Sequence, residues 1–323
     1  MLPDATTPLD ADTARTAFGA LLDGAVAEAD AARFLTDMTE RDETAVEIAA
    51  AAQALRARVV PVKAPEGAID VCGTGGDGSH SLNVSTAVAI VVAACDVPVA
   101  KHGNRAASSK AGAADTLEAL GLDLDRASET AERTLADLGI AFMFAQTHNP
   151  ALAKLAPLRR KIGRRTIFNL IGPLANPAGV RRQLIGIARP DYLAVVGEAL
   201  TLLGADDALL VAGEEPLDEL SVAARSHWWR YGGASGTMTP EEAGLGRHSL
   251  EALRGRDAAY NAGALRLLLS GELGAYRDAV LLNAAGALIV AGHARDWQDG
   301  VEEAAEAIDK GLAKALLDCW IAY

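Results

Sequence analysis

Residues 70–78, with the sequence Asp-Val-Cys-Gly-Thr-Gly-Gly-Asp-Gly, constrain the fold of this chain most strongly. The apolar run 67–72, which overlaps their start, predicts a buried strand. The long apolar segment 85–95 predicts a helix with Asn83 or Ser85 near its N-cap. A glycine loop between a strand and a helix N-terminus suits an anion, because glycine lets the backbone approach a phosphate and the free N–H groups favour negative charge. The sequence therefore predicts a phosphate site at this loop.

Two other interpretations of the loop fit less well. Residues 73–78 match the pattern G-x-G-x-x-G, but a dinucleotide-binding loop needs an acidic residue at the end of the next strand, where Lys101 stands. Residues 79–82 also separate the loop from the predicted helix. A Walker A loop is excluded because no Gly-Lys-Ser/Thr follows the glycines. A phosphate with a nearby cation is the better interpretation.

The charge balance argues against some classes of partner. The chain has 323 residues, with 43 Asp and Glu against 30 Lys and Arg, which gives a net charge of −13. So acidic a chain disfavours nucleic acid or a membrane as partner, but not a small anion held by local positive charge.

No apolar run reaches the roughly 18 residues of a membrane span, and no signal peptide is visible. Cys72, Cys95 and Cys319 lack disulfide or metal spacing, so we expect free thiols and a cytoplasmic location.

The periodicity of apolar residues divides the chain. Residues 1–65 show helical spacing and no strand signal, which predicts a small all-helical unit with helices at 12–22, 27–38 and 43–59. From residue 67 onward strands alternate with helices, which favours an α/β domain with a mostly parallel central sheet covered on both faces. The further predicted elements are strands at 97–100, 141–144, 184–187 and 208–212, and helices at 114–120, 127–138, 192–203, 261–269, 276–291 and 297–316. The basic, proline-punctuated segment 150–177 interrupts this alternation.

The second predicted strand runs into a polar loop that contains cations, hydroxyls and an amide. Lys101 can pair with a phosphate, while the hydroxyls of Ser108 and Ser109 donate hydrogen bonds to its oxygens. Asn104 offers both a donor and an acceptor to an uncharged or zwitterionic substrate. The loop therefore extends the predicted phosphate site toward a second substrate.

Two residues of this loop have alternative roles. Arg105 either joins the site or pairs with a carboxylate of the fold. His102 is either a general base or, equally, a packing or orienting side chain.

Residues 158–165 form a dense basic cluster with five cations in an acidic chain. Most of these side chains are expected on a solvated helix face, where a run of charges usually lies. One arginine that reaches into a cleft could bind a substrate carboxylate through two N–H donors.

Asp218 and Glu219 follow the predicted strand 208–212. Adjacent carboxylates at a strand end can hold a hard cation, and Mg²⁺ would bridge such a pair to a polyphosphate. An Asp-Glu pair alone is a common surface feature, but the predicted phosphate loop strengthens the metal interpretation.

These motifs together resemble those of the anthranilate phosphoribosyltransferases, and the similarity runs over nearly the whole chain. The segments that carry it are 73–78, 83–86, 101–105, 114–115, 117–121, 164–177 and 218–219. The resemblance implies a fold shared with pyrimidine nucleoside phosphorylases. It consists of a helical domain, 1–65 with 151–180 packed onto it, and an α/β domain, 66–150 and 181–323. It also implies a homodimer formed through the helical domain.

The activity implied is a glycosyltransferase reaction of tryptophan biosynthesis, transfer of the phosphoribosyl group from phosphoribosyl pyrophosphate to anthranilate. Catalysis would come from positioning and electrostatics, with no catalytic acid or base. Gly73, Asn104 and Arg159 would contact anthranilate. Two Mg²⁺ ions are expected, one held by Ser85 and Glu219 and the other by Asp218 and Glu219. The residues expected to bind phosphoribosyl pyrophosphate are Gly73, Gly76, Asp77, Ser81, Asn83, Val84, Ser85, Thr86, Lys101, His102, Gly103, Asn104, Arg105, Ala106, Ala107, Ser108, Ser109 and Ala113.

Three positions depart from the family pattern. Asn149 stands where a histidine is common, Pro216 where a glycine usually precedes the triplet Leu/Met-Asp-Glu, and Ala113 where a serine is common. The changes affect an aromatic-acid contact, the stiffness of the metal loop and one phosphate hydrogen bond.

Two other functions stay open. A pyrimidine nucleoside phosphorylase would use inorganic phosphate without the Asp-Glu pair, and a non-catalytic nucleic-acid-binding paralogue would show a basic face.

Overall fold

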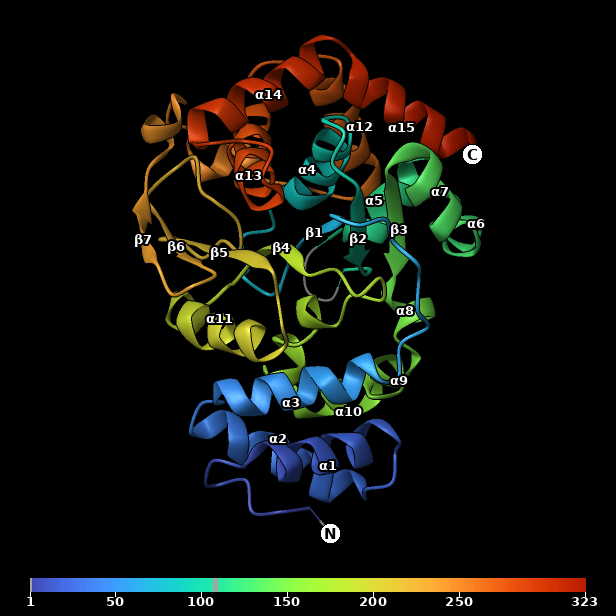
Figure 1. The fold of residues 1–323 in the computed structure, drawn as a ribbon, viewed down its shortest axis with the longest axis vertical. Coiled ribbons are helices and arrows are strands. Elements are labelled where there is room, and N and C mark those ends of the chain that lie inside the picture. The colour runs from blue at the N-terminus through green and yellow to red at the C-terminus, as the bar shows by residue number, and fades with distance from the viewer. Residues whose placement is uncertain (1, 107–109) are drawn as a thin grey trace.

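The computed structural model describes residues 2–106 and 110–323. It consists of a small helical domain and a larger α/β domain, with the N-terminal helices at one end, the sheet in the middle and the C-terminal helices at the other end (Figure 1). The N-terminal helices are α1 (Ala11–Leu22), α2 (Glu28–Glu40) and α3 (Ala45–Arg56). The side chain of Asp10 caps α1, because Asp10 lies in an extended conformation and accepts hydrogen bonds from the next turn.

The central sheet has seven strands in the order β3-β2-β1-β4-β5-β6-β7. Neighbours from β3 to β5 pair in parallel, and β6 and β7 add an antiparallel hairpin at one edge. This confirms the predicted mostly parallel sheet. The strands are β1 (Ile69–Gly73), β2 (Val99–Gly103), β3 (Ile140–Phe144), β4 (Arg182–Gly186), β5 (Asp207–Gly213), β6 (Ser226–Arg230) and β7 (Ser235–Met238).

Helices cover both faces of the sheet (Figure 1). One face packs against α4 (Val84–Ala93), α5 (Ala113–Leu120), α6 (Leu124–Glu129), α12 (Ala258–Leu269), α13 (Ala275–Ala291), α14 (Trp297–Asp309) and α15 (Leu312–Ala322). The other face packs against α11 (Leu193–Leu202), which shares its core with α3. The single helix expected at 297–316 is two helices, because Gly311 has a φ of +73° and separates them. The helix expected at 127–138 is likewise interrupted at Thr130, and its second part is α7 (Ala131–Leu138).

The segment 150–177 contains only short helical pieces that pack onto the N-terminal helices. They are α9 (Pro150–Lys154), α10 (Ala156–Ile162), η1 (Ile167–Asn169) and η2 (Pro173–Ala175), and α8 (Ala145–His148) precedes them. Phe168 packs edge-to-face on Phe18 of α1, with ring centroids 6.2 Å apart. The domain boundaries expected at 65, 150 and 180 stay a prediction.

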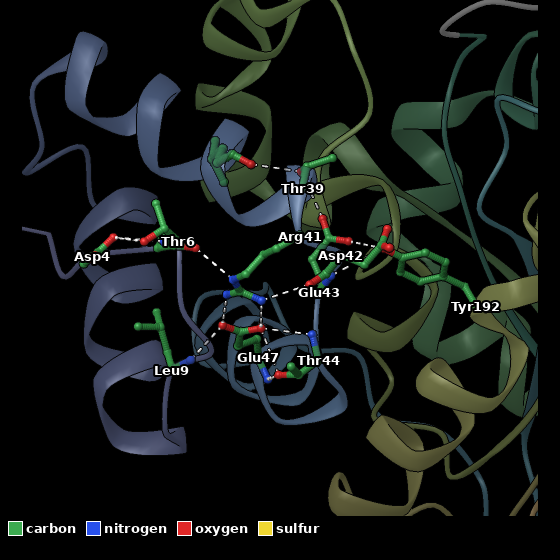
Figure 2. A network of polar contacts seen from close by, with 12 residues as sticks. Asp4, Thr6, Leu9, Thr39, Arg41, Asp42, Glu43, Thr44, Glu47 and Tyr192 are labelled. Atoms are coloured by element: carbon green, nitrogen blue, oxygen red, sulfur yellow. Dashed lines mark hydrogen bonds and ion pairs between the residues drawn. The ribbon is translucent and has the colours of Figure 1, made fainter.

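A polar network joins the helical bundle to the α/β domain (Figure 2). Glu47 is fully buried, pairs with Arg41, and accepts the Leu9 N–H at 2.9 Å. Tyr192, in the short turn η3 (Pro190–Tyr192), donates to Asp42 at 3.0 Å and contacts Glu43. The α2–α3 connection is thus fixed on both sides. None of the helices in the described ranges combines the length and apolar content needed to cross a bilayer.

Candidate active site

Three neighbouring strands of the sheet, β1, β4 and β5, end in glycines, and the Asp218 loop crosses directly over them. A Cβ on Gly186 would lie 1.6 Å from the Asp218 backbone oxygen, and one on Gly73 would lie 2.3 Å from Asp218 Oδ2. A Cβ on Gly213 would lie 3.1 Å from Leu217 Cβ. The glycines therefore allow the Asp218 backbone to rest on the strand ends. The sequence analysis assigned no role to Gly186 or Gly213.

The glycine loop after β1 is held by the acidic residues that follow it. Gly75 N–H donates to Asp218 Oδ2 at 2.7 Å. The Asp77 carboxylate accepts from the backbone N–H of Ser79 at 3.2 Å and from its hydroxyl at 2.7 Å. Gly75, Gly76 and Gly78 have positive φ, as the tight loop requires. The protein's own hydrogen bonds consequently fix the shape of the loop, and Ser81 continues it with an N–H bond to Ser79 Oγ at 3.2 Å.

Asp218 and Glu219 lie together in a crowded negative environment. Burial, followed by the charge of Asp77, raises the pKa of Asp218 to about 7. Burial and the charge of Asp218 raise the pKa of Glu219 well above its usual range. One oxygen of Glu219 accepts the Ser85 N–H at 3.2 Å. Uncompensated carboxylate oxygens of this kind suit a hard divalent cation.

The carboxylates fit Mg²⁺ only as a partial ligand set. In the described ranges, no three His, Cys, Asp or Glu side chains are arranged to hold a metal by themselves. Mg²⁺ usually binds one or two carboxylates and completes its shell with substrate phosphates and water. The Asp218–Glu219 pair fits that pattern and requires a phosphorylated ligand.

Asn283 of α13 clamps the loop that carries the acidic pair. Its Oδ1 accepts the Leu220 N–H at 2.9 Å, and its Nδ2 donates to the Leu220 carbonyl at 3.0 Å. The side chain is fully buried. Sequence reasoning missed this residue, because a buried asparagine in the middle of an apolar helix is the only signal for it. Despite the stiffening expected from Pro216, Asp218 lies over Gly73.

Asn83 occupies the N-cap position of α4, but its side chain does not cap that helix. Its Oδ1 accepts from Thr116 Oγ1 at 2.6 Å and from Asn261 Nδ2 at 2.9 Å, and its Nδ2 donates to the Ala111 carbonyl at 3.3 Å. The amide therefore ties the start of α4 to α5 and α12. Next to it Val84 is buried, Ser85 is half-buried, and the buried hydroxyl of Thr86 has no hydrogen-bond partner among the described residues.

Lys101 and His102 lie inside β2, whereas the sequence analysis expected them in the loop after it. The strand continues because its pairing with β3 extends to Gly103. The Lys101 side chain is 2% exposed, and its Nζ donates to the Val71 carbonyl at 2.7 Å and lies 3.4 Å from Ser85 Oγ. This places its charge beside the acidic pair, where it opposes the rise in the pKa of Glu219.

His102 points away from that cluster and contacts Asn149. Its Nε2 lies 2.7 Å from Asn149 Nδ2, and the Gly172 backbone partly offsets the effect of burial on the pKa of the ring. Nε2 is therefore an acceptor, and the Asn149 amide donates to it. Burial lowers the pKa of His102 to about 4, so the ring is neutral at physiological pH. These contacts match the packing and orienting role and give the ring no free base nitrogen.

The loop after β2 contains one surface ion-pair cluster. Arg105 pairs with Asp115 and with Glu118, each at 2.8 Å, and its guanidinium lies over Phe144. This is the structural role that the sequence left open for Arg105. Asn104 is exposed and Ala106 is half-buried, while Ala113 begins α5. The predicted contacts at Ala107, Ser108 and Ser109 lie outside the described residues.

The basic cluster divides into surface and half-buried cations. Lys161 pairs with Glu28 at 2.5 Å and Arg164 with Glu40 at 3.0 Å, both on α2. Arg159 is half-buried, and burial lowers its pKa with no opposing carboxylate. Arg165 has a buried Nη2 without a hydrogen-bond partner in the described ranges. Sequence reasoning expected one such arginine and chose Arg159, so it missed Arg165.

Known proteins match the chain over almost its full length. Residues 5–59 match the helical bundle domain and residues 65–314 the a/b domain of a glycosyl transferase family. Anthranilate phosphoribosyltransferase from Novosphingobium aromaticivorans is 63% identical over 325 residues, which cover 100% of this chain and 98% of that protein. The protein of the same name from Sphingopyxis alaskensis is 61% identical, over 99% of this chain and 98% of that protein.

Solved structures agree with these sequence matches. Anthranilate phosphoribosyltransferase from Thermus thermophilus superposes with a TM-score of 0.93 at 42% identity, covering 98% of this chain and 96% of that chain. The enzyme from Saccharomyces cerevisiae, in complex with PRPP and Mg, gives a TM-score of 0.89 at 27% identity, covering 99% and 93%.

Proposed function

We propose how this chain, which belongs to the anthranilate phosphoribosyltransferase family, uses the site described above. The enzyme transfers the phosphoribosyl group from phosphoribosyl pyrophosphate to anthranilate, giving N-(5-phosphoribosyl)anthranilate and pyrophosphate in tryptophan biosynthesis. The reaction uses Mg²⁺. The observation that carries the assignment of roles is the contact between Asp218 and the glycine loop, which joins a metal-binding carboxylate to an anion-binding backbone.

The glycine loop and the start of α4 bind phosphoribosyl pyrophosphate. The shape of the loop is fixed before the substrate arrives, because the Asp218 carboxylate accepts the Gly75 N–H and the Asp77 carboxylate accepts the N–H and the hydroxyl of Ser79. Such a preformed site loses little free energy in ordering when it binds an anion. Lys101 adds a buried positive charge beside Ser85. Of the remaining predicted contacts among the described residues, Gly103 ends β2, Asn104, Arg105 and Ala106 follow it, and Ala113 begins α5.

Two Mg²⁺ ions per chain bind at the acidic pair, one with Ser85 and Glu219 and one with Asp218 and Glu219. The raised pKa values of both carboxyl groups support this, because a cation would offset the repulsion that raises them. A cation held by these side chains would neutralise the charge that develops on the departing pyrophosphate.

Anthranilate binds at the strand ends, to Gly73, Asn104 and Arg159. Arg159 supplies the carboxylate site, because its guanidinium is half-buried and no carboxylate among the described residues neutralises it. Its helix, α10, packs onto the helical domain through Leu158. The aromatic acid therefore lies between the two domains.

The chemical step is a displacement at the ribose C1 carbon. The C–O bond to pyrophosphate breaks with its electron pair leaving on pyrophosphate, a C–N bond forms to the aromatic amine, and the amine loses one proton. The amine is a weak nucleophile, so bond breaking leads and C1 acquires oxocarbenium character. The fold contributes positioning of the amine and stabilisation of the leaving charge by the glycine-loop N–H groups and Lys101.

The enzyme works as a homodimer in the cytoplasm, with the helical domain as the contact between protomers. Its domains divide at residues 65, 150 and 180. The packing of 150–177 on α1 and α2 supports that division, and the three free cysteines are consistent with the compartment.

Loss of anthranilate fluorescence tests the activity and the metal together. The assay contains phosphoribosyl pyrophosphate and Mg²⁺, with and without a chelator. We expect turnover that the chelator abolishes and that excess Mg²⁺ restores. Thymidine phosphorolysis by the same preparation, without anthranilate turnover, would instead favour the nucleoside phosphorylase alternative.

A further inference from the structure

Arg165 is a cation next to the glycine loop that forms no ion pair with the described residues. A Cβ on Gly76 would lie 4.0 Å from Arg165 Nη1, so the guanidinium borders the loop at its centre. Its Nη2 is buried and has no hydrogen-bond partner among the described residues. An unpaired, buried N–H donor on a charged group is unfavourable unless a ligand completes it.

The backbone around Arg165 is fixed, so the guanidinium is held at this place. Gly163 has a φ of +66° and ends α10. Directly after Arg165, Thr166 N–H donates to Asn169 Oδ1 at 3.1 Å, and Asn169 N–H returns a bond to the Thr166 carbonyl at 2.8 Å. Ile167 and Phe168 are buried in the core that contains the N-terminal helices. Arg165 thus projects from the helical side of the molecule toward a loop of the α/β domain.

The position favours a phosphate over a carboxylate as the anion. Gly76 lies between two other glycines of positive φ in the loop to which phosphoribosyl pyrophosphate is assigned. Asp77 and Asp218 already place negative charge at this loop, and a pyrophosphate adds more. A guanidinium beside Gly76 reduces that repulsion and matches two phosphate oxygens with its planar pair of N–H donors.

We infer that Arg165 binds the pyrophosphate group of the donor substrate beside Gly76, and thereby stabilises it as the leaving group. This inference rests on the proposed function. It separates the roles of two arginines in one segment, with Arg159 recognising the acceptor and Arg165 the donor. It also links the domains, because pyrophosphate would join the glycine loop to a residue packed on the helical bundle.

Binding of inorganic pyrophosphate in the presence of Mg²⁺, measured by calorimetry without anthranilate, tests this role. The variants are Arg165→Met, Arg165→Lys and Arg159→Met, with Arg164→Met as the matched surface control. We expect Arg165→Met to weaken pyrophosphate binding by about 10- to 100-fold, the range of a charge-assisted hydrogen bond. Arg165→Lys should recover part of the loss, because it keeps the charge without the planar fork. Arg159→Met and Arg164→Met should leave the affinity unchanged.

Thermal unfolding of the free enzyme separates binding from structure. Because Arg165 Nη2 has no partner among the described residues, Arg165→Met should unfold at the same or a higher temperature than the wild type. Unchanged pyrophosphate affinity in Arg165→Met, or a loss shared equally by Arg159→Met, would overturn the inference. Failure of the wild type to consume anthranilate would overturn the proposed function instead.

Discussion

The two sides of the candidate site are built in opposite ways. On the loop side, Asp77, Asp218 and Glu219 accept hydrogen bonds from the protein's own backbone. On the side of the segment 150–177, Arg159 and Arg165 lack such partners among the described residues. Before substrate arrives, the loop side is therefore crowded with negative charge, and on the other side no ion pair with the described residues neutralises Arg159 or Arg165. Substrates with several anionic groups, together with Mg²⁺, would balance both.

The largest expected effect comes from removing the acidic charge of the loop side. In the variant Asp218→Asn with Glu219→Gln, we expect kcat to fall about a thousand-fold or more, because the metal ligands and the leaving-group stabilisation are lost together. The folded state should survive, since burial already disfavours charge on both groups. Steady-state assays and circular dichroism measure the two outcomes. Glu214→Gln, an exposed carboxylate of the same loop, is the control. Full Mg²⁺-dependent turnover in the double variant would contradict the assignment of Asp218 and Glu219 as Mg²⁺ ligands.

A smaller but still large effect is expected from displacing the same loop without touching its charges. In Gly186→Ala the new methyl would overlap the Asp218 backbone oxygen, so the loop must move. We expect kcat/KM to fall by about 100-fold, the usual consequence of misplacing a group by roughly 1 Å. Gly263→Ala, where a Cβ meets nothing within 4 Å, should keep full activity. Equal activity of the two variants would show that the seating of Asp218 on the strand end is unimportant.

On the cationic side, Arg159→Ala should act on one substrate alone. We expect KM for anthranilate to rise by about 10- to 100-fold, as for a lost charge-assisted pair, with KM for phosphoribosyl pyrophosphate little changed. Varying each substrate in turn at saturating levels of the other gives both values. An unchanged KM for anthranilate would show that its carboxylate binds elsewhere.

His102 of β2 contacts Asn149, which directly precedes the segment 150–177, and this contact should respond to pH. The folded-state pKa of His102, about 4, lies below the unfolded value near 6.5. As pH falls between these values the unfolded chain binds a proton that the folded chain does not, so stability falls. From pH 7 to pH 5 the linked loss is about 2 kcal/mol. In His102→Asn, urea unfolding at the two pH values should show a change smaller by that amount. An identical pH dependence would indicate that His102 titrates normally.

The smallest effect concerns the link that holds the domains together away from the site. Tyr192→Phe removes the hydroxyl that contacts Asp42 and Glu43 (Figure 2). We expect the free energy of unfolding to fall by about 1 kcal/mol, the typical net value of a hydrogen bond, with KM for both substrates unchanged. Tyr260→Phe, on an exposed side chain, is the control. A change in KM would connect this network to the site.

The sequence predicted the strands and helices better than it predicted the residues at which they end. Apolar runs located β1, β3 and β5 to within a few residues, because these strands are buried on both faces. The end of β2 was wrong, since Lys101 and His102 are polar yet remain in the ladder. Their burial is offset by Val71, Asn149 and Gly172, which are distant in sequence. The division of the helix expected at 297–316 depends on the φ of Gly311, which composition alone does not specify.

The site was predictable where one short stretch carries the chemistry. The glycine loop and the Asp218–Glu219 pair are of this kind. The residues that bring these two motifs together were not predictable, because their role depends on which distant segments of the chain meet in the fold. The side chain of Asn283 clamps Leu220 from α13, and Gly186 admits the backbone of Asp218. In the same way the charges of Arg159 and Arg164 look alike in sequence, and their burial and partners distinguish them.

The central claim is that donor substrate and metal lie between the glycine loop and the acidic pair. A crystal structure of the enzyme with phosphoribosyl pyrophosphate and Mn²⁺, with the anomalous signal of the metal, tests it most directly. We predict anomalous density at Asp218 and Glu219 and pyrophosphate density over Gly76. Metal density away from both carboxylates, or pyrophosphate bound outside the glycine loop, would contradict the account.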